Sequence, residues 1–196
     1  VGFLNSQIFF LMLPLLGGVL SIGLGGSLLA REEQDGTIES LLARPVSRGR
    51  ILWEKAVAGA AILGLVSGLG GLATIISARV VGISVSSWTI ATTSLVCFLL
   101  CLSFGAVSFL VTSMGKARGA SIGIGALVAL GGYMISSLAG TITWLEWPAR
   151  FLPFHYYQSD ALLRGQYSWL NALYFVALTV ACGLASWIVF RRRDID

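Results

Sequence analysis

The residues that could do chemistry are few and lie far apart in the sequence. The chain has one histidine, His155, and three cysteines within apolar runs, Cys97, Cys101 and Cys182. Cys97 and Cys101 would share a helix face at spacing i, i+4, but two thiols without a nearby histidine or carboxylate make a poor metal site. We therefore interpret the cysteines as reduced core residues and expect no bound metal.

A serine–histidine pair for intramembrane proteolysis is the remaining catalytic possibility. Ser27, in the sequence GGSLLA, is the one loose candidate nucleophile, and we expect it at the opposite end of a membrane span from His155. The sequence contains no GxxxxGK[ST] phosphate loop; the nearest string, SMGKARG, lacks the leading glycine and the hydroxyl after Lys116. We therefore predict neither a catalytic site nor a cofactor site in this chain.

The composition indicates a polytopic membrane protein. The 196 residues are 56% hydrophobic and 11% charged, with a mean hydropathy of +0.86, whereas a soluble domain carries about 25% charged residues. The sequence contains no basic cluster with interleaved aromatic residues, so it does not indicate nucleic-acid binding. We predict one all-α transmembrane domain over residues 1–196. A span needs about 20 apolar residues, and five segments qualify: Gln7–Ala30, Ile51–Val81, Trp88–Thr112, Gly119–Ala139 and Leu170–Phe190.

The distribution of Lys and Arg predicts the orientation in the membrane. The side that holds residues 31–55, the TSMGKARG turn and the RRRDID tail carries ten of these residues, and the other side carries three, Arg79, Arg150 and Arg164. Because the side with more Lys and Arg faces the cytoplasm, we expect a cytoplasmic C-terminus. Five spans then put the N-terminus outside, so we expect a six-span native subunit of which this chain is the last five.

The expected spans are rich in small residues. The pairs Gly64/Gly68 and Gly119/Gly123 lie four residues apart, which permits close contact between membrane helices. No Asp, Glu, Lys or Arg is expected near the middle of a span. This absence disfavours an ion-coupled carrier, since such carriers usually place ionisable groups there.

An aromatic segment at about 141–169 precedes the last span on the expected outer side. Pro148 and Pro153 prevent one long helix, and we expect a short interfacial or re-entrant element followed by a small helix near Tyr157–Leu163. Two interpretations stay open. The segment is either an aromatic anchor at the membrane interface or an outer gate formed by Pro153, Phe154, Tyr156 and Tyr157.

The segment 28–55, LLAREEQDGTIESLLARPVSRGRILWEK, is the one part of the sequence with a soluble character. Asp35-Gly36 is a turn signal, Thr37 can cap a short helix, and Pro45 ends it. The helix TIESLLA has an apolar face of Ile38, Leu41 and Leu42. Because a helix this short is not stable alone, it must dock against the membrane surface, its own bundle or a cytoplasmic partner.

This segment resembles the first cytoplasmic loop of ABC-transporter permeases of the type-two exporter class. The family pattern is roughly E-[RK]-E-x-G-T-x-E-x-L-L-x-x-P-[VI]-[ST]-R-x-x-[IL]-x-x-x-K. The matching residues are Glu33, Gly36, Thr37, Glu39, Leu41, Leu42, Pro45, Val46, Ser47, Arg48, Ile51 and Lys55. The stretch LPFHYYQSDALLRGQYSW is similar to the outer segment of that family, although Ser159 or Asp160 stands where proline is common.

The resemblance implies a dimer of six-span permease subunits, identical or different, above a dimer of cytoplasmic ATPases. The ATPases would bind ATP and Mg, and this chain would hold no cofactor. A cytoplasmic loop at about 31–50 would carry a coupling helix that lies in a groove of the ATPase. The expected coupling residues are Glu32, Glu33, Gly36, Thr37, Ile38, Glu39, Leu41, Leu42, Pro45 and Arg48. The implied location is the cell membrane, as a multi-pass protein of the prokaryotic plasma membrane.

Two other functions remain possible at this point. The loop alone is also compatible with a membrane scaffold that recruits a cytoplasmic protein without transport, and the acidic cluster is compatible with a solvated loop. The intramembrane enzyme is disfavoured because catalytic residues are missing. The substrate stays open among antibiotics, lipids, ions and peptides, and the apolar spans mildly favour a hydrophobic one.

Overall fold

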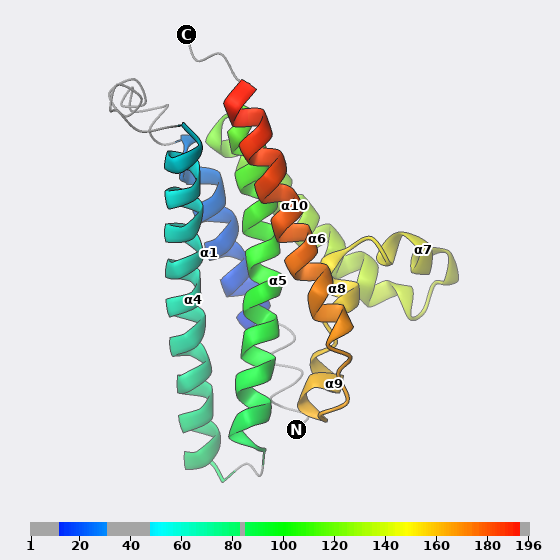
Figure 1. The fold of residues 1–196 in the computed structure, drawn as a ribbon. Helices are drawn as coiled ribbons and strands as arrows, with labels where there is room; N and C mark the ends of the chain where they lie inside the picture. Colours follow the sequence, from blue (N-terminus) through cyan, green and yellow to red (C-terminus); the bar gives the residue numbers. More distant parts are fainter. Residues whose placement is uncertain (1–11, 31–47, 83–84, 193–196) are drawn as a thin grey trace.

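The computed structural model describes residues 12–30, 48–82 and 85–192, and all of the regular structure in these ranges is helical. Figure 1 shows the helices as one elongated bundle with a lateral projection. The elements are α1 Leu13–Ser27, α4 Arg48–Val80, α5 Ser87–Ser113, α6 Arg118–Ala139, the 3-10 turn η2 Thr143–Leu145, α7 Glu146–Ala149, α8 Pro153–Tyr156, α9 Ser159–Leu163 and α10 Leu170–Arg192.

Four of the five expected spans are confirmed as helices of spanning length and hydropathy. They are α4, α5, α6 and α10, with 22 to 33 residues each. At about 1.5 Å per residue, 22 residues cover about 33 Å, which exceeds the hydrocarbon core of about 30 Å. The expected first span corresponds to α1, which has 15 described residues and is apolar but short. These helices indicate a membrane-integrated protein.

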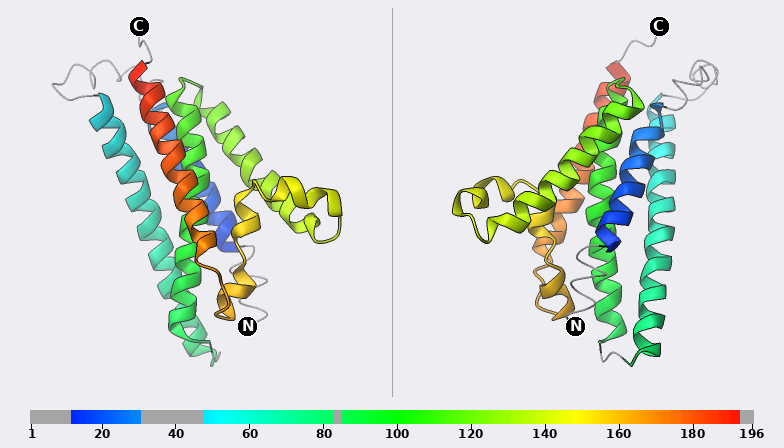
Figure 2. Two further views of the ribbon diagram at one scale, coloured as in Figure 1. Left: turned by 45° about the vertical axis from the view of Figure 1, so that its right-hand side comes forward. Right: turned by 180° about the vertical axis from the view of Figure 1, so that it is seen from behind.

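Helix α5 lies at the centre of the bundle. In its most apolar window 61% of the residues are buried, against 22% in each of α4, α6 and α10. Figures 1 and 2 show α1, α4, α6 and α10 arranged around it. The main core cluster follows from this position, because it is built on one side of α5 by Val96, Cys97, Leu100, Cys101 and Phe104. The three cysteines are buried free thiols.

Small residues set the spacing between α1, α5 and α6. A Cβ added to Gly25 of α1 would clash with the carbonyl oxygen of Gly105 of α5, and one added to Gly125 of α6 would clash with the Ser108 hydroxyl. Serine hydroxyl groups also form hydrogen bonds between the same pairs of helices. Ser21 Oγ donates to the Cys101 carbonyl at 2.5 Å, and Ser108 Oγ donates to the Ser121 carbonyl at 3.1 Å. Buried hydroxyls in membrane helices need such partners.

The glycine pairs singled out from the sequence are not the ones that make these contacts. A Cβ on Gly68, Gly119 or Gly123 would meet no described atom within 4 Å, and one on Gly64 would make ordinary contact with the Phe98 ring. Spacing along one helix shows which glycines share a face. It does not show which face meets a neighbouring helix, and that is why the expectation missed Gly25 and Gly105.

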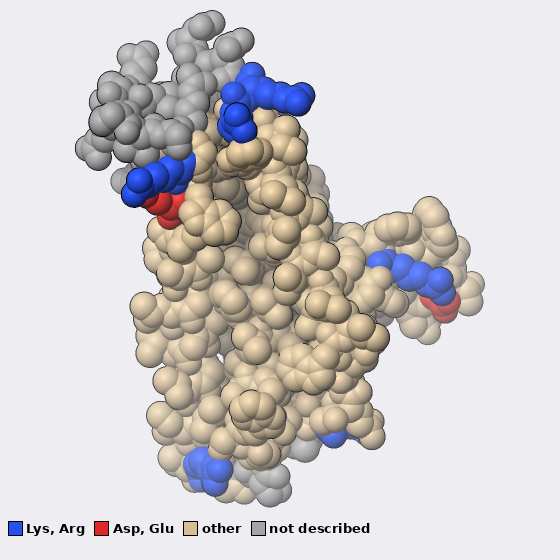
Figure 3. All heavy atoms as spheres, in the orientation of Figure 1, with Lys and Arg blue, Asp and Glu red and all other residues tan. Residues whose placement is uncertain are grey.

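The two ends of the bundle differ in their charge. Figures 1 and 2 place the C-terminal end of α10, the start of α4 and the α5–α6 turn at one end, which we call the basic end. The described cations there are Arg50, Lys55, Lys116, Arg118, Arg191 and Arg192. The opposite end holds Arg79 at the end of α4 and Arg164 after α9. On the face shown in Figure 3, Lys and Arg lie at both ends and on the lateral projection, with none across the middle of the bundle.

The lateral projection, which we call the side arm, consists of residues 140–152 with η2 and α7. It extends from the end of α6 away from the bundle (Figures 1 and 2). Trp144 and Trp147 are about 70% exposed on it. Arg150 follows α7. Arg150 therefore lies beside the bundle. The count of Lys and Arg had grouped it with Arg79 and Arg164, which lie at the end opposite the basic end.

Candidate functional site

The expected coupling residues lie almost entirely outside the described residues. Residues 31–47 include all of them except Arg48, at which α4 begins. What the structure describes is how the helices on either side of this segment are held. Figure 1 places the end of α1 and the start of α4 close together at the basic end.

A buried cluster joins the helices that flank residues 31–47, which we call the charged segment, to the rest of the bundle. Leu29, two residues after α1, packs with Leu52 of α4, Phe109 of α5 and Phe190 of α10, and all four side chains are at most 6% exposed. We call this group the basic-end cluster. Because interiors are close-packed and transmit strain, a displacement of either flanking helix end reaches α5 and α10 as well.

The segment expected to form an outer gate packs into the bundle between α5, α6 and α10. The Phe154 ring lies 5.5 Å from that of Phe104 on α5 and 5.5 Å from that of Tyr133 on α6, centroid to centroid. Tyr157 is 4% exposed and belongs to the core cluster with Cys97 and Cys101. Phe104 is 17 residues along α5, about 25 Å from its start. Phe154 therefore reaches far into the bundle.

Tyrosine hydroxyls hold this segment in place. Tyr156 donates to the Arg150 carbonyl at 2.9 Å and stacks on the Tyr174 ring of α10, with centroids 4.2 Å apart. Tyr174 donates to the Phe151 carbonyl at 2.6 Å, and Tyr167 donates to the Tyr156 carbonyl at 3.2 Å. The bond from Tyr174 ties the side arm to α10, the bond from Tyr156 ties α8 to the side arm, and the bond from Tyr167 ties the stretch before α10 to α8.

Burial raises the pKa of two tyrosines in this region. Burial raises the pKa of Tyr167 to about 12 and raises the pKa of Tyr157, which also lies beside Cys97. The neutral phenol is the form that donates the bond from Tyr167 to Tyr156. The Tyr167 hydroxyl therefore keeps its proton and its bond to the Tyr156 carbonyl across the physiological pH range.

The four residues expected to form the outer gate lie within five consecutive positions of the sequence, and the structure shows where each one packs. Pro153 begins α8 and is buried, Phe154 and Tyr157 face the core, and Tyr156 faces Tyr174. The small helix expected near Tyr157–Leu163 is present as α9. Trp144 and Trp147 of the side arm are instead exposed, and the interpretation of this part as an interface anchor stays a prediction. The segment thus has a packed part and an exposed part.

The serine and histidine considered for catalysis lie on different elements. Ser27 ends α1 at the basic end, and its hydroxyl donates to the Leu24 carbonyl at 3.2 Å. His155 lies in α8, where its ring contacts Tyr156 edge to face. Figure 1 shows the end of α1 and α8 at different heights of the bundle.

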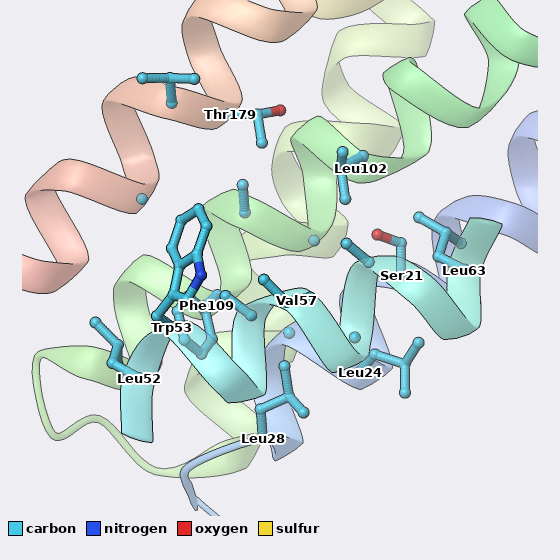
Figure 4. A pocket seen from close by; sticks show the side chains of 18 of the residues that line it. Ser21, Leu24, Leu28, Leu52, Trp53, Val57, Leu63, Leu102, Phe109 and Thr179 are labelled. Carbon is cyan, nitrogen blue, oxygen red and sulfur yellow. The ribbon is translucent and has the colours of Figure 1, made fainter. Parts of the chain in front are cut away.

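A cavity of about 650 Å³ lies between α1, α4, α5 and α10, in the half of the bundle nearest the basic end. We call it the inter-helix cavity, and Figure 4 shows it from close by. Small residues contribute to its lining on two helices, with Ala56, Gly59 and Ala60 on α4 and Gly183 on α10. Among the described residues that line it, none is charged.

Comparison with known families adds one finding. Residues 1–195 match the model of a family described as protein of unknown function (DUF2705). The chain belongs to this family. A comparison with curated proteins gives no match.

The inter-helix cavity of this DUF2705 chain is the feature that sequence reasoning missed. A weak signal was present, because Ala56, Gly59 and Ala60 follow the spacing i, i+3, i+4 and therefore share one face of α4. Small residues at that spacing are as compatible with close helix packing as with a cavity. Only the position of α10 relative to α4 decides between the two.

Proposed function

We propose that this chain is the membrane-spanning permease subunit of an ATP-driven ABC exporter of the type-two class. The sequence features that suggest it are the turn predicted at Gly36–Thr37, the short apolar helix predicted after it and the helix end predicted at Pro45. The structural observation that supports it is the basic-end cluster, in which Leu29, Leu52, Phe109 and Phe190 join both ends of the charged segment to four helices.

In this proposal the charged segment transmits movement from a partner ATPase to the bundle. ATP binding would close an ATPase dimer and displace the helix at residues 37–43. Leu29 and Leu52 lie on either side of that helix in the sequence and pack in one cluster. A shift of the helix therefore moves α1 and α4 together, and through Phe109 and Phe190 it also moves α5 and α10.

The orientation follows the positive-inside rule. The basic end, with the charged segment and the C-terminal tail, would face the cytoplasm, and α9 would lie outside. The aromatic packing of Phe154 and Tyr157 would then close the bundle between its middle and its outer end, so we assign the outer gate to these two side chains. The hydrophobic spans and the apolar cavity favour a hydrophobic substrate over an ion.

A second permease subunit completes the proposed assembly. The exposed face of α6 carries Gly119 and Gly123, which have no described neighbour near a Cβ position, together with Leu127 at 73% exposure. Glycines four residues apart let a second helix approach closely. This face is our candidate for the contact between two permease subunits, identical or different.

Co-purification with the cognate ATPase tests the proposal. The chain is co-expressed with the ATPase of the neighbouring reading frame, and the complex is isolated from membranes through a tag on the permease. Leu41→Asp should abolish recovery of the ATPase, because it places a charge on the apolar face of the short helix. Ser40→Asp adds the same charge to the opposite face of that helix and should leave recovery intact.

Two outcomes would contradict the proposal. Equal ATPase recovery with Leu41→Asp and Ser40→Asp would exclude docking through the apolar face. An ATPase that binds but hydrolyses ATP at the same rate with and without the permease in lipid vesicles would favour the scaffold function instead.

A further inference from the structure

The inter-helix cavity is about as long, parallel to the helices, as one leaflet of a bilayer is thick. Its lining runs along α4 from Leu52 to Leu63 and along α10 from Thr179 to Trp187. At about 1.5 Å per residue these stretches are about 16 Å and about 12 Å long. Half of the hydrocarbon core is about 15 Å. The cavity is therefore a slot parallel to the helices and as deep as one acyl chain in the leaflet nearest the basic end.

The cavity opens sideways, toward the place where lipid would lie. Trp53 of α4 and Leu184 of α10 lie on its two sides, and they are 70% and 59% exposed. At the basic end α10 contacts α4, because the Trp187 indole packs so tightly on Gly49 of α4 that an added Cβ would lie 2.7 Å from Nε1. Figure 4 shows the lining side chains of α1, α4, α5 and α10 around this space.

The lining selects an apolar occupant. Of the hydroxyl groups at the cavity, Ser21 Oγ already donates to the Cys101 carbonyl, and Thr179 Oγ1 is a single buried atom without a partner among the described residues. One free hydroxyl cannot replace the hydration shell of a polar solute, since a buried polar group without a bond costs free energy. Its volume lies within the range of about 300–1,000 Å³ that is typical of small-molecule sites.

Cations lie at the basic end of the slot. The Arg191 guanidinium lies 4.5 Å from the centre of the Trp187 ring, which itself lines the cavity. Arg50 lies on the first turn of α4 and forms an exposed ion pair with Glu54 at 2.8 Å. Exposed ion pairs are weak, so Arg50 remains available to an anion. An apolar slot with cations at one end is complementary to an anionic amphiphile.

We propose that the inter-helix cavity binds one acyl chain of an anionic membrane lipid, with the headgroup at Arg191 and Arg50. The acyl chain of the lipid enters between α4 and α10, and the small side chains that line the slot on these two helices leave room for it. This inference does not depend on the proposed transport function, because it concerns binding from the surrounding bilayer and needs no partner protein.

Photolabelling with a lipid probe tests the proposal. The full chain is reconstituted into phosphatidylcholine vesicles that contain phosphatidylglycerol with a diazirine on one acyl chain, and labelled peptides are identified by mass spectrometry. We expect labels on the cavity-lining stretches of α4 and α10 in excess of those on the outward face of α6, and we expect unlabelled phosphatidylglycerol to displace them.

Gly183→Leu is the decisive variant. A Cβ at Gly183 would meet nothing within 4 Å, so the leucine side chain occupies space in the cavity without a clash, competes with the acyl chain for that space and should reduce cavity labelling about tenfold, which corresponds to about 1.4 kcal/mol. Gly131→Leu is the matched control on α6, where a Cβ also meets nothing within 4 Å. Both variants are first checked for a monodisperse profile and wild-type helix content.

The headgroup is tested separately. Arg191→Gln should reduce the preference for phosphatidylglycerol over a phosphatidylcholine probe with the same chain about fivefold, since one cation near a membrane surface contributes about that factor. Equal cavity labelling in wild type and Gly183→Leu would overturn the assignment of the slot to a lipid chain. An unchanged preference in Arg191→Gln, or equal labelling by a neutral diazirine alkane that phosphatidylglycerol does not displace, would overturn the anionic lipid.

Discussion

Gly25 of α1 lies directly against Gly105 of α5, so closely that a Cβ on Gly25 would clash with the Gly105 carbonyl oxygen. The contact brings α1 near enough for Ser21 to bond the Cys101 carbonyl and for Thr112 Oγ1 to reach the Gly25 carbonyl at 3.4 Å. The short helix α1 is thereby fixed to the central helix. Its end leads into the charged segment, so this contact positions one side of the candidate coupling region.

Gly25→Ala tests the close contact. The single added methyl group cannot fit against the Gly105 carbonyl, so the two helices must separate, and we expect a loss of about 3 kcal/mol in the free energy of unfolding, at the upper end for overpacking. The measurement is reversible unfolding in detergent micelles. Gly23→Ala is the control on the same helix, because a Cβ there meets nothing within 4 Å. Equal destabilisation by both changes would contradict the contact.

Phe154→Ala tests the packed part of the outer segment. The change removes a ring that contacts Phe104 and Tyr133, and for a half-buried aromatic we expect a loss of about 2 kcal/mol in the free energy of unfolding. Trp144→Ala removes a larger ring that is 72% exposed on the side arm, and it should change the stability by less than about 0.5 kcal/mol. The same unfolding assay compares the two variants, and a larger effect of Trp144→Ala would show that α8 is not packed in the core.

The raised pKa of the Tyr167 phenol predicts that the stability of the protein depends on pH in the alkaline range. Its pKa is raised to about 12 in the folded protein, above the ordinary value of about 10. Between these values the unfolded chain releases the proton while the folded protein keeps it. Stability that is fully present below pH 10 is therefore lost as the pH rises toward 12.

Alkaline unfolding curves of wild type and Tyr167→Phe check this dependence. The wild type should lose stability more steeply between about pH 10 and about pH 12, because phenylalanine does not titrate. Ionisation of the phenol can be followed in parallel by ultraviolet difference absorbance. Identical slopes for the two proteins would contradict the raised pKa.

Cysteine labelling tests the orientation. The structure places Lys116, in the α5–α6 turn, and Arg164, after α9, at opposite ends of the bundle (Figure 1). A membrane-impermeant maleimide added to intact cells should label Arg164→Cys and not Lys116→Cys, and lysis should expose the second site. The native cysteines are buried, which keeps the background low. Labelling of both sites in intact cells would exclude the orientation.

Local sequence properties were sufficient to predict the four long helices of this protein. Hydropathy over about 20 residues depends only on neighbouring side chains, so the bounds of α5, α6 and α10 agree with the expected spans within one or two residues. The same reasoning placed a small helix at α9, because Pro148 and Pro153 exclude a continuous one. The distribution of Lys and Arg in the sequence also separated the cations of the basic end from those of the opposite end, except for Arg150, which lies on the side arm.

The tertiary structure decided how these helices meet. It brought Gly25 to Gly105, drew Phe154 toward Phe104, and left the inter-helix cavity between the small residues of α4 and Gly183 of α10. Each of these features depends on the rotation and separation of two helices that are distant in the sequence. In a membrane, where lipid is as apolar as the helices, close packing and hydrogen bonds rather than hydropathy choose the contact faces. A hydropathy pattern therefore places each span without specifying its neighbours.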